Sequence, residues 1–392
     1  MPGFELIGKE EQNAVNEVFE KSNGVLYRYG LDERRHHIFR VSEFEKEIAK
    51  KIGVKYAQCV FNGTAALKIA LFGLGIKKGD EVITQSFTFI ATVEAILELG
   101  AIPVITEIDK SLNMDPIDLE KKISKKTKAI IPVHMAGVAA KMDEIITIAR
   151  KYNIPILEDS AQALGAIYKS KNLGTIGDAG IYSLDIGKVI TTGEGGILVT
   201  NKEKIFLKAR EYSDHGHKQN PNVPRGEDTR SRWGFNYKMT ELQGAIGLAQ
   251  LKKLDFITQK QRENKYHIKN GIKDIPGIEF REIPNPKGDA GDTLIFFVES
   301  RKKASKFAKL LSKTGVGTKN LPDAINWHFA GTWEHIFYNY PEYRGKNLEK
   351  IWGQSTNYVR RAISIPIMVC MTDEKINYLI QSIKDIAKKV LE

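Results

Sequence analysis

The sequence predicts an α/β protein, with a large domain on a mostly parallel central sheet and a smaller C-terminal α+β domain. Three observations predict this fold class. Short apolar runs alternate with helix-like stretches from about residue 42, the 392 residues suffice for about two or three domains, and the pattern changes after residue 272. We place the large domain at residues 1–265 and the small domain at residues 266–392.

Apolar runs mark the strands of the large domain. We expect strands at residues 57–61, 81–84, 102–106, 129–133, 154–158, 179–184 and 196–201. Helices are expected at residues 41–52, with Ser42 as a cap, and at residues 65–73 and 240–260. Because strands that alternate with helices pair in parallel, helices should cover both faces of the sheet. Ligands of such sheets collect at the carboxyl ends of the strands.

The remaining segments differ in character. Strands at residues 277–282 and 293–298 and helices at residues 304–315 and 373–391 are expected in the small domain. Residues 214–234 are polar, rich in Pro, Gly and Arg, and lack periodicity. A connection of this length is either a functional loop or a mobile one.

Composition narrows the class of protein. Hydrophobic residues at 42% and charged residues at 27% are ordinary for a globular chain. Cys59 and Cys370 can form neither a disulfide framework nor a metal site, and we expect no metal and a cytoplasmic location. The first residues do not resemble a signal peptide, and no apolar stretch has the length of a membrane span. Secreted disulfide scaffolds, membrane proteins and disordered chains are therefore excluded.

The net charge of +11 does not indicate a nucleic-acid partner. Basic residues that bind phosphates of nucleic acids usually cluster on one element. Here they are scattered as pairs beside apolar residues, at 50–51, 77–78, 121–122, 125–126, 252–253 and 388–389. We interpret them as solvated helix faces.

Two residues in the middle of the chain, Asp159 and Lys188, are candidates for a catalytic role. Asp159 follows an expected strand, where an isolated Asp is more often a helix cap. Lys188 lies between two expected strands, just before a run of glycines at 193, 195 and 196. A lysine that is partly removed from water has a lowered pKa and can form a Schiff base with a carbonyl.

Together these residues predict a pyridoxal 5′-phosphate site. That cofactor requires an amine for its aldehyde and an acid beside its pyridine nitrogen. Asn62, Gly63 and Thr64 end a strand and open a helix, where backbone N–H groups can bind the phosphate. This tripeptide alone is also a common turn, but with Asp159 and Lys188 it forms a strong pattern.

At this point the sequence resembles the DegT/DnrJ/EryC1/StrS sugar aminotransferases, which are fold type I pyridoxal phosphate enzymes. The matching segments are residues 44–47, 62–67, 86–92, 158–163, 193–196 and 234–243, together with Ser183 and Lys188. The resemblance implies transfer of an amino group from an amino acid, with L-glutamate expected as donor, to a keto-sugar. A dehydratase branch of the family has His in place of the Schiff-base lysine, so Lys188 favours transamination.

The resemblance also implies a role for each matching residue. Lys188 would form the Schiff base and carry the proton, and Asp159 would pair with the pyridinium. Gln162 would contact the phenolic oxygen, and Phe89 would stack on the ring unless it is a core aromatic. Asn236 would reach the phosphate of the neighbouring subunit in a homodimer that shares its sites, and Glu194 would lie near the cofactor or the sugar. The phosphate would be held by Gly63, Thr64, Ala65 and Ser183.

The sequence departs from the family pattern in four places, of which the last is residues 320–333. Residues 184–187 (Leu-Asp-Ile-Gly) replace an aromatic, basic and proline-containing stretch before Lys188. Residues 34–37 and the arginines of the 214–234 segment are either ligands for an anionic sugar or a solvated loop; these arginines are Arg225, Arg230 and Arg232.

Residues 320–333 carry Trp327, His328 and Trp333, which suit stacking on a sugar or packing as an aromatic hairpin. The pattern Trp-His-Phe-Ala at residues 327–330 resembles the 8-amino-3,8-dideoxy-octulosonate transaminase branch, which implies lipopolysaccharide or surface-sugar biosynthesis. A nucleotide-linked 3- or 4-keto-6-deoxyhexose is the alternative substrate. A regulatory homologue that binds the cofactor without turnover is the alternative class.

Overall fold

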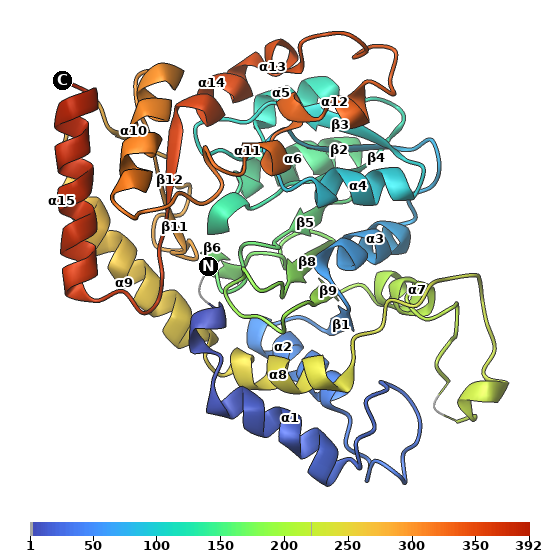
Figure 1. Ribbon diagram of the computed structural model, residues 1–392. Helices are drawn as coiled ribbons and strands as arrows, with labels where there is room; N and C mark the ends of the chain where they lie inside the picture. Colours follow the sequence, from blue (N-terminus) through green and yellow to red (C-terminus); the bar gives the residue numbers. More distant parts are fainter. Residues whose placement is uncertain (1–2, 221) are drawn as a thin grey trace.

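A sheet of parallel strands with one antiparallel member forms the centre of the computed structural model, which describes residues 3–220 and 222–392 (Figure 1). Parallel bridges from Ile130 to Ile156 and from Val133 to Asp159 join its two parts. Neighbouring strands run parallel except where they pair with β9. The strand order is β1 (Tyr56–Val60), β9 (Gly196–Thr200), β8 (Ala179–Ser183), β5 (Leu157–Asp159), β4 (Thr127–Ile131), β2 (Glu81–Gln85) and β3 (Ile102–Thr106).

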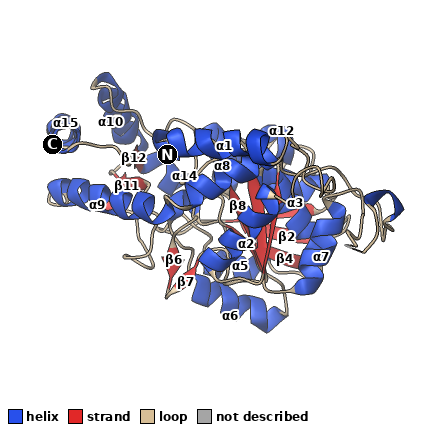
Figure 2. Ribbon diagram, turned by 90° about the horizontal axis from the view of Figure 1, so that it is seen from below, coloured by secondary structure: helices blue, strands red, loops and turns tan. Residues whose placement is uncertain are grey.

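Helices cover both faces of this sheet, which confirms the predicted fold class (Figure 2). Alternate residues of one strand belong to different cores: Leu198 of β9 packs on one face, and its neighbours Ile197 and Val199 pack on the other. The Leu198 face is covered by α3 (Gly63–Leu74), α4 (Ala91–Glu98) and α7 (Glu203–Tyr212). The opposite face is covered by α2 (Arg40–Ile52), α5 (Pro116–Lys122) and α6 (Met142–Tyr152).

The expected helix at residues 240–260 is two helices, α8 (Glu241–Leu251) and α9 (Leu254–Ile272). They bury different faces. Helix α8 packs closely on α2 and on α1 (Lys9–Lys21), and a Cβ at Gly247 would lie 2.7 Å from the Phe44 ring. Helix α9 begins in the core of the large sheet with Leu254 and ends at the small sheet with Ile272. The chain must therefore bend between them.

The small sheet is antiparallel, in the order β10 (Glu279–Phe280), β11 (Thr293–Phe297) and β12 (Ala362–Pro366). Strand β10 is shorter than expected, and β12 was not expected. Helices α9, α10 (Arg301–Lys313) and α15 (Asp373–Val390) cover one face. The proposed boundary after residue 265 falls inside α9, so the division into two domains stays a prediction.

Short elements complete the described chain. Residues 325–361, between α10 and β12, pack against large-domain residues such as Phe87 and bury Trp333, so Trp333 is a core residue and not a sugar-stacking one. A hairpin of β6 (Ile167–Tyr168) and β7 (Lys171–Asn172) lies beside the sheet. Residues 325–361 contain the helices α11 (Ile325–His328), α12 (Glu334–Phe337), α13 (Leu348–Ile351) and α14 (Gly353–Arg361).

Helix α2 begins at Arg40, so the expected cap at Ser42 is wrong. The Glu241 carboxylate takes that place, because it accepts hydrogen bonds from the Arg40 N–H at 2.6 Å and the Val41 N–H at 3.4 Å. The same carboxylate lies 2.8 Å from the fully buried Arg35 guanidinium. Arg35 is therefore bound within the chain and cannot serve a sugar.

Apart from Pro221, which lies outside the described residues, the 214–234 segment projects from the body of the protein (Figure 1). Two of its arginines, Arg225 and Arg232, have partners inside the chain. Arg225 donates two hydrogen bonds of 2.6 Å to the buried Asp214, and Arg232 pairs with Glu211 at 3.0 Å. These pairings disfavour the alternative in which Arg225 and Arg232 bind an anionic sugar.

Within the described residues, none of the helices combines the length and the apolar character needed to cross a bilayer.

Candidate active site

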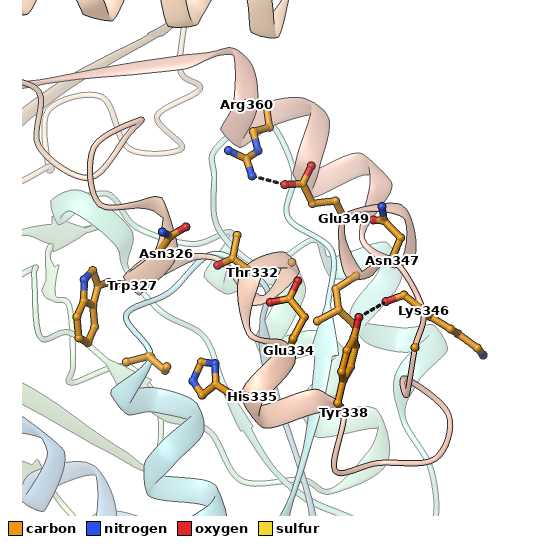
Figure 3. Close-up of a pocket in the computed structure, with 14 residues that line it drawn as sticks. Asn326, Trp327, Thr332, Glu334, His335, Tyr338, Lys346, Asn347, Glu349 and Arg360 are labelled. Atoms are coloured by element: carbon orange, nitrogen blue, oxygen red, sulfur yellow. Dashed lines mark hydrogen bonds and ion pairs between the residues drawn. The ribbon is translucent and has the colours of Figure 1, made fainter.

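Two hollows lie on either side of the segment that contains Phe89 and Ile90. The outer groove has a volume of about 1000 Å³ and a polar lining that includes Trp327, His335 and Arg360. Figure 3 shows Arg360 paired with Glu349 at the far end of this groove. The inner cavity has a volume of about 370 Å³ and lies at the carboxyl ends of β4, β5 and β8.

The inner cavity brings together most residues that the sequence singled out. Gly63, Thr64, Phe89, Asp159, Gln162, Ser183, Lys188, Glu194 and His328 line it. Four expected residues do not: Trp327 lines the outer groove, Ala65 lies in the first turn of α3, Arg230 is exposed on the projecting segment, and Asn236 is exposed just after it. The sequence did not indicate a role for several polar lining residues, among them Thr88, Thr92, Asp185 and Asn320.

Asp159 is fixed at the end of β5 and is 3% exposed. Its Oδ2 accepts a hydrogen bond of 2.8 Å from the Thr92 hydroxyl, and its Oδ1 accepts one of 3.1 Å from the Ala161 N–H. Burial raises the pKa of Asp159, and the bonds from Thr92 and Ala161 oppose that rise. A positive group in the cavity would therefore find a preorganised partner here.

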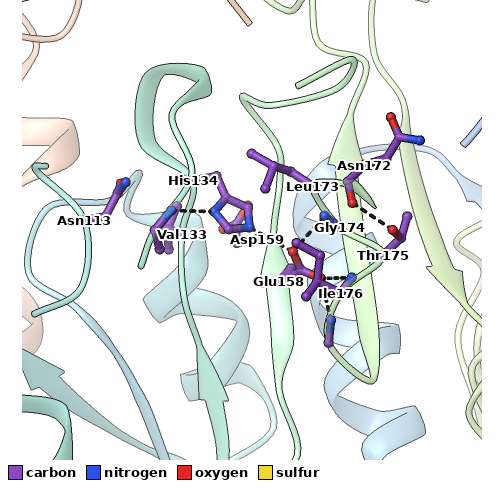
Figure 4. A network of polar contacts seen from close by, with 12 residues as sticks. Asn113, Val133, His134, Glu158, Asp159, Asn172, Leu173, Gly174, Thr175 and Ile176 are labelled. Carbon is purple, nitrogen blue, oxygen red and sulfur yellow. Dashed lines mark hydrogen bonds and ion pairs between the residues drawn. The ribbon is translucent and has the colours of Figure 1, made fainter. Parts of the chain in front are cut away.

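Behind Asp159, a buried network fixes the strand ends (Figure 4). The Glu158 carboxylate accepts hydrogen bonds from His134 Nε2 at 3.0 Å and from the N–H groups of Gly174, Ile176 and Gly177 at 2.9, 2.6 and 2.6 Å. His134 Nδ1 accepts from the Ala140 N–H at 3.1 Å, so Nε2 carries the proton. Because side chains alternate along a strand, Glu158 anchors β5 while Asp159 points to the opposite side.

Lys188 lies in the turn that follows β8. Its backbone oxygen accepts a hydrogen bond of 3.0 Å from the Gly3 N–H, and its N–H donates to the Asp185 oxygen at 3.0 Å. Burial is the main cause of the lowered pKa of Lys188, and the charge of Lys319 adds to it. A lowered pKa increases the fraction of neutral amine, which is the nucleophilic form.

The start of α3 forms a cradle for an anion. The Asn62 side chain caps the helix by accepting a hydrogen bond of 2.8 Å from the Ala65 N–H. N–H groups in the first turn of a helix lack intrahelical partners, and the helix dipole favours a negative charge there. A Cβ at Gly63 would lie 2.9 Å from Ser183 Cβ, so glycine lets the helix approach the Ser183 hydroxyl.

Comparisons with known proteins agree with this geometry. The profile of the DegT/DnrJ/EryC1/StrS aminotransferase family matches residues 7–384. The chain belongs to this family. The spore coat polysaccharide biosynthesis protein SpsC of Bacillus subtilis is 33% identical over 394 residues, which cover 98% of this chain and 96% of that protein.

Two further proteins are similar to the chain. A GDP-perosamine synthase of Caulobacter vibrioides is 43% identical over 220 residues, which cover 55% of this chain and 57% of that protein. The X-ray structure of an aminotransferase from Psychrobacter cryohalolentis matches with a TM-score of 0.86 at 28% identity and covers 98% of each chain. The chain is a pyridoxal phosphate-dependent sugar aminotransferase of fold type I.

The residues of the inner cavity fit the family's cofactor. The amine of Lys188 suits its aldehyde, the buried carboxylate of Asp159 suits its pyridinium, and the cradle at Gly63 and Ser183 suits its phosphate. Phe89 is 41% exposed, so it is not a core aromatic, and its ring centroid lies 5.4 Å from that of His328. When bound, the cofactor supplies an electron sink for the carbon that loses its proton.

The lowered pKa of Lys188 predicts a pH-dependent loss of folding stability in the cofactor-free protein. Because the folded protein binds the Lys188 proton more weakly than the unfolded chain, burial of this amine destabilises the fold at neutral pH. We expect the Lys188→Met variant to be more stable than the wild type there. The difference should disappear as the pH rises past the usual lysine value of 10.5, where the unfolded chain also loses its proton.

Urea unfolding of both cofactor-free proteins between neutral pH and about pH 11 measures this difference. A stability difference that stays constant over the whole pH range would show that burial does not shift the pKa of Lys188.

Proposed function

We propose that this sugar aminotransferase takes its amino group from L-glutamate and transfers it to 8-keto-3,8-dideoxy-octulosonate in the synthesis of a lipopolysaccharide or another surface sugar. The presence of Lys188 and Asp159 in one cavity with an anion cradle carries the reaction type. The Trp-His-Phe-Ala pattern at residues 327–330 supports the choice of sugar. There, Trp327 stacks beside Phe89 with centroids 6.4 Å apart and planes inclined by 16°.

In this proposal each of the cavity residues has a separate role. The Lys188 amine would hold the aldehyde of the cofactor and would move the proton between the donor carbon and the cofactor. Asp159 keeps the pyridine nitrogen protonated. Gln162 uses its Oε1 to accept a hydrogen bond of 2.9 Å from the Ala136 N–H, which directs its amide N–H₂ to the phenolic oxygen. Glu194, whose pKa is raised by burial and by Asp185, lies on the sugar side.

We also propose that the enzyme is a cytoplasmic homodimer with shared sites. The lining of the inner cavity, as formed by the described residues, contains Asp185 and Glu194 but no arginine. A free sugar carboxylate and the cofactor phosphate therefore need cations or donors from elsewhere. Arg230 is exposed on the projecting segment and Asn236 is exposed just after it, on either side of Trp233, which is 67% exposed. Contact of this segment with a second copy would bury the tryptophan and bring both side chains to the partner's cavity.

A nucleotide-linked 3- or 4-keto-6-deoxyhexose is the second candidate substrate. Two observations favour it: the similarity to a GDP-perosamine synthase, and an outer groove of about 1000 Å³ beside Trp327, which offers room for a nucleotide. A homologue that binds the cofactor without turnover is disfavoured, because Lys188, Asp159 and Gln162 all line the cavity.

The substrate assignment is tested by a panel of keto-sugars with and without a nucleotide. We expect L-glutamate to convert the bound cofactor to its amine form and 8-keto-3,8-dideoxy-octulosonate to accept the amine. The Lys188→Ala variant should lose the Schiff-base absorbance and at least about 10³-fold in turnover, because it lacks both nucleophile and proton carrier. The Lys202→Ala variant, which removes an exposed lysine, is the control.

Amine formation is measured by mass spectrometry, and the cofactor form by absorbance. If the GDP-linked 4-keto-6-deoxyhexose were aminated and the other keto-sugars of the panel were not, the second candidate would be established. Normal turnover by Lys188→Ala would contradict the proposed reaction.

Shared sites predict complementation between two variants. In a mixed dimer of Lys188→Ala and Asn236→Ala subunits, one site contains an intact lysine and receives an intact Asn236 from its partner. Random reassortment should restore about a quarter of the wild-type activity at limiting cofactor, because half of the dimers are mixed and each has one complete site. The assay compares each variant alone with the refolded mixture. An activity equal to the average of the two variants would mean that each site is built from one chain.

A further inference from the structure

The wall of the inner cavity contains an amide that no group in the described chain satisfies. Asn320 lines the cavity and is 4% exposed, and its buried Nδ2 has no hydrogen-bond partner among the described residues. Buried donors are nearly always paired, because an unpaired one has lost its bonds to water without replacement. An unused donor in a substrate cavity indicates that the partner is a ligand.

The backbone around Asn320 is held firmly, so the free amide does not result from a loose segment. Ser364 of β12 accepts hydrogen bonds at its Oγ from the N–H groups of Asn320 at 3.1 Å and Leu321 at 2.9 Å. Its backbone oxygen accepts from the Lys319 N–H at 3.0 Å. Lys319 is itself fixed by Asp292 and by Thr293, 2.7 Å away. Asn320 is therefore presented to the cavity by a rigid support.

His328 lines the same cavity and offers the complementary group. Its Nδ1 donates a hydrogen bond of 2.8 Å to the backbone oxygen of Ala324, so this nitrogen carries the proton. Burial and the charges of Lys188 and Lys319 lower the pKa of His328 to about 4, which keeps the ring neutral at physiological pH. The other ring nitrogen, Nε2, is then a hydrogen-bond acceptor.

We propose that Asn320 and His328 together bind a hydroxyl group on a carbon next to the substrate carbonyl. This inference rests on the proposed amination of a keto-sugar and identifies the group that the cavity recognises. A hydroxyl can accept a hydrogen bond from Asn320 Nδ2 and donate one to His328 Nε2. A carboxylate has no proton for His328, and an ammonium has no lone pair for Asn320. The pair therefore selects the polyol part of the sugar.

The test uses two aldehydes of similar size, D-glyceraldehyde with two hydroxyl groups and propanal with none. The full-length enzyme is loaded directly with pyridoxamine 5′-phosphate, and return of the aldehyde form of the cofactor is followed in a single turnover. We expect the wild type to prefer D-glyceraldehyde at least about tenfold in the second-order rate constant, as one or two neutral hydrogen bonds allow. Asn320→Ala should reduce this preference to below about threefold.

Two further variants make the result specific. Asn320→Asp keeps the size of the side chain and removes the N–H donor, so it should also lose the preference even if Asn320→Ala folds poorly. Asn326→Ala removes an amide of the outer groove and should keep the wild-type preference. A second readout is equilibrium binding of the product amines, 3-amino-1,2-propanediol and propylamine, to the pyridoxal phosphate form. The wild type should favour the diol to a similar extent.

A wild type without preference, or Asn320 variants that keep it, would overturn the assignment of the hydroxyl site. The proposed glutamate donor is tested separately, by conversion of the aldehyde form of the cofactor. Because pyridoxamine phosphate is supplied directly, failure of that conversion and failure of the hydroxyl preference are distinguishable.

Discussion

The parallel pairing of β5 with β8 is the interaction on which the site depends. It places Asp159 opposite Ile181, two residues before Ser183. The Asp159 carboxylate and the Ser183 hydroxyl therefore lie at the same carboxyl end of the sheet. Lys188 follows in the turn after β8, on the same edge. Glu158 reinforces this pairing from behind, because its carboxylate binds His134 and the backbone of the turn that precedes β8. A shift of β5 by one residue would turn Asp159 away from the cavity.

The site concentrates groups that the fold does not satisfy by itself. Asp159 is buried with a raised pKa, Lys188 has a lowered pKa, and Asn320 retains an unused donor. Each of these groups would be more stable in water or beside a partner. All three groups lie at the carboxyl end of the sheet. They lower the stability of the cofactor-free fold there, and they are available to bind a ligand. In our proposal, the bound cofactor and substrate supply the missing partners.

Local patterns predicted the strands of the large sheet and the acid–lysine pair, because apolar periodicity and short motifs are properties of neighbouring residues. The break between α8 and α9 was missed, since it depends on two distant cores that the helices cover. Arg35 and Arg225 were misjudged for the same reason: their partners, Glu241 and Asp214, could not be identified from spacing. Asn320 stands in no recognisable motif, and its role becomes visible only from its unsatisfied amide.

The central claim is that Lys188 forms the covalent link to the cofactor. Reduction of the holoenzyme with borohydride, followed by proteolysis and mass spectrometry, tests it most directly. The account predicts that the reduced cofactor is attached to Lys188 and that prior treatment with L-glutamate, which releases this lysine, prevents the labelling. Attachment to another lysine, or labelling that glutamate does not prevent, would contradict it.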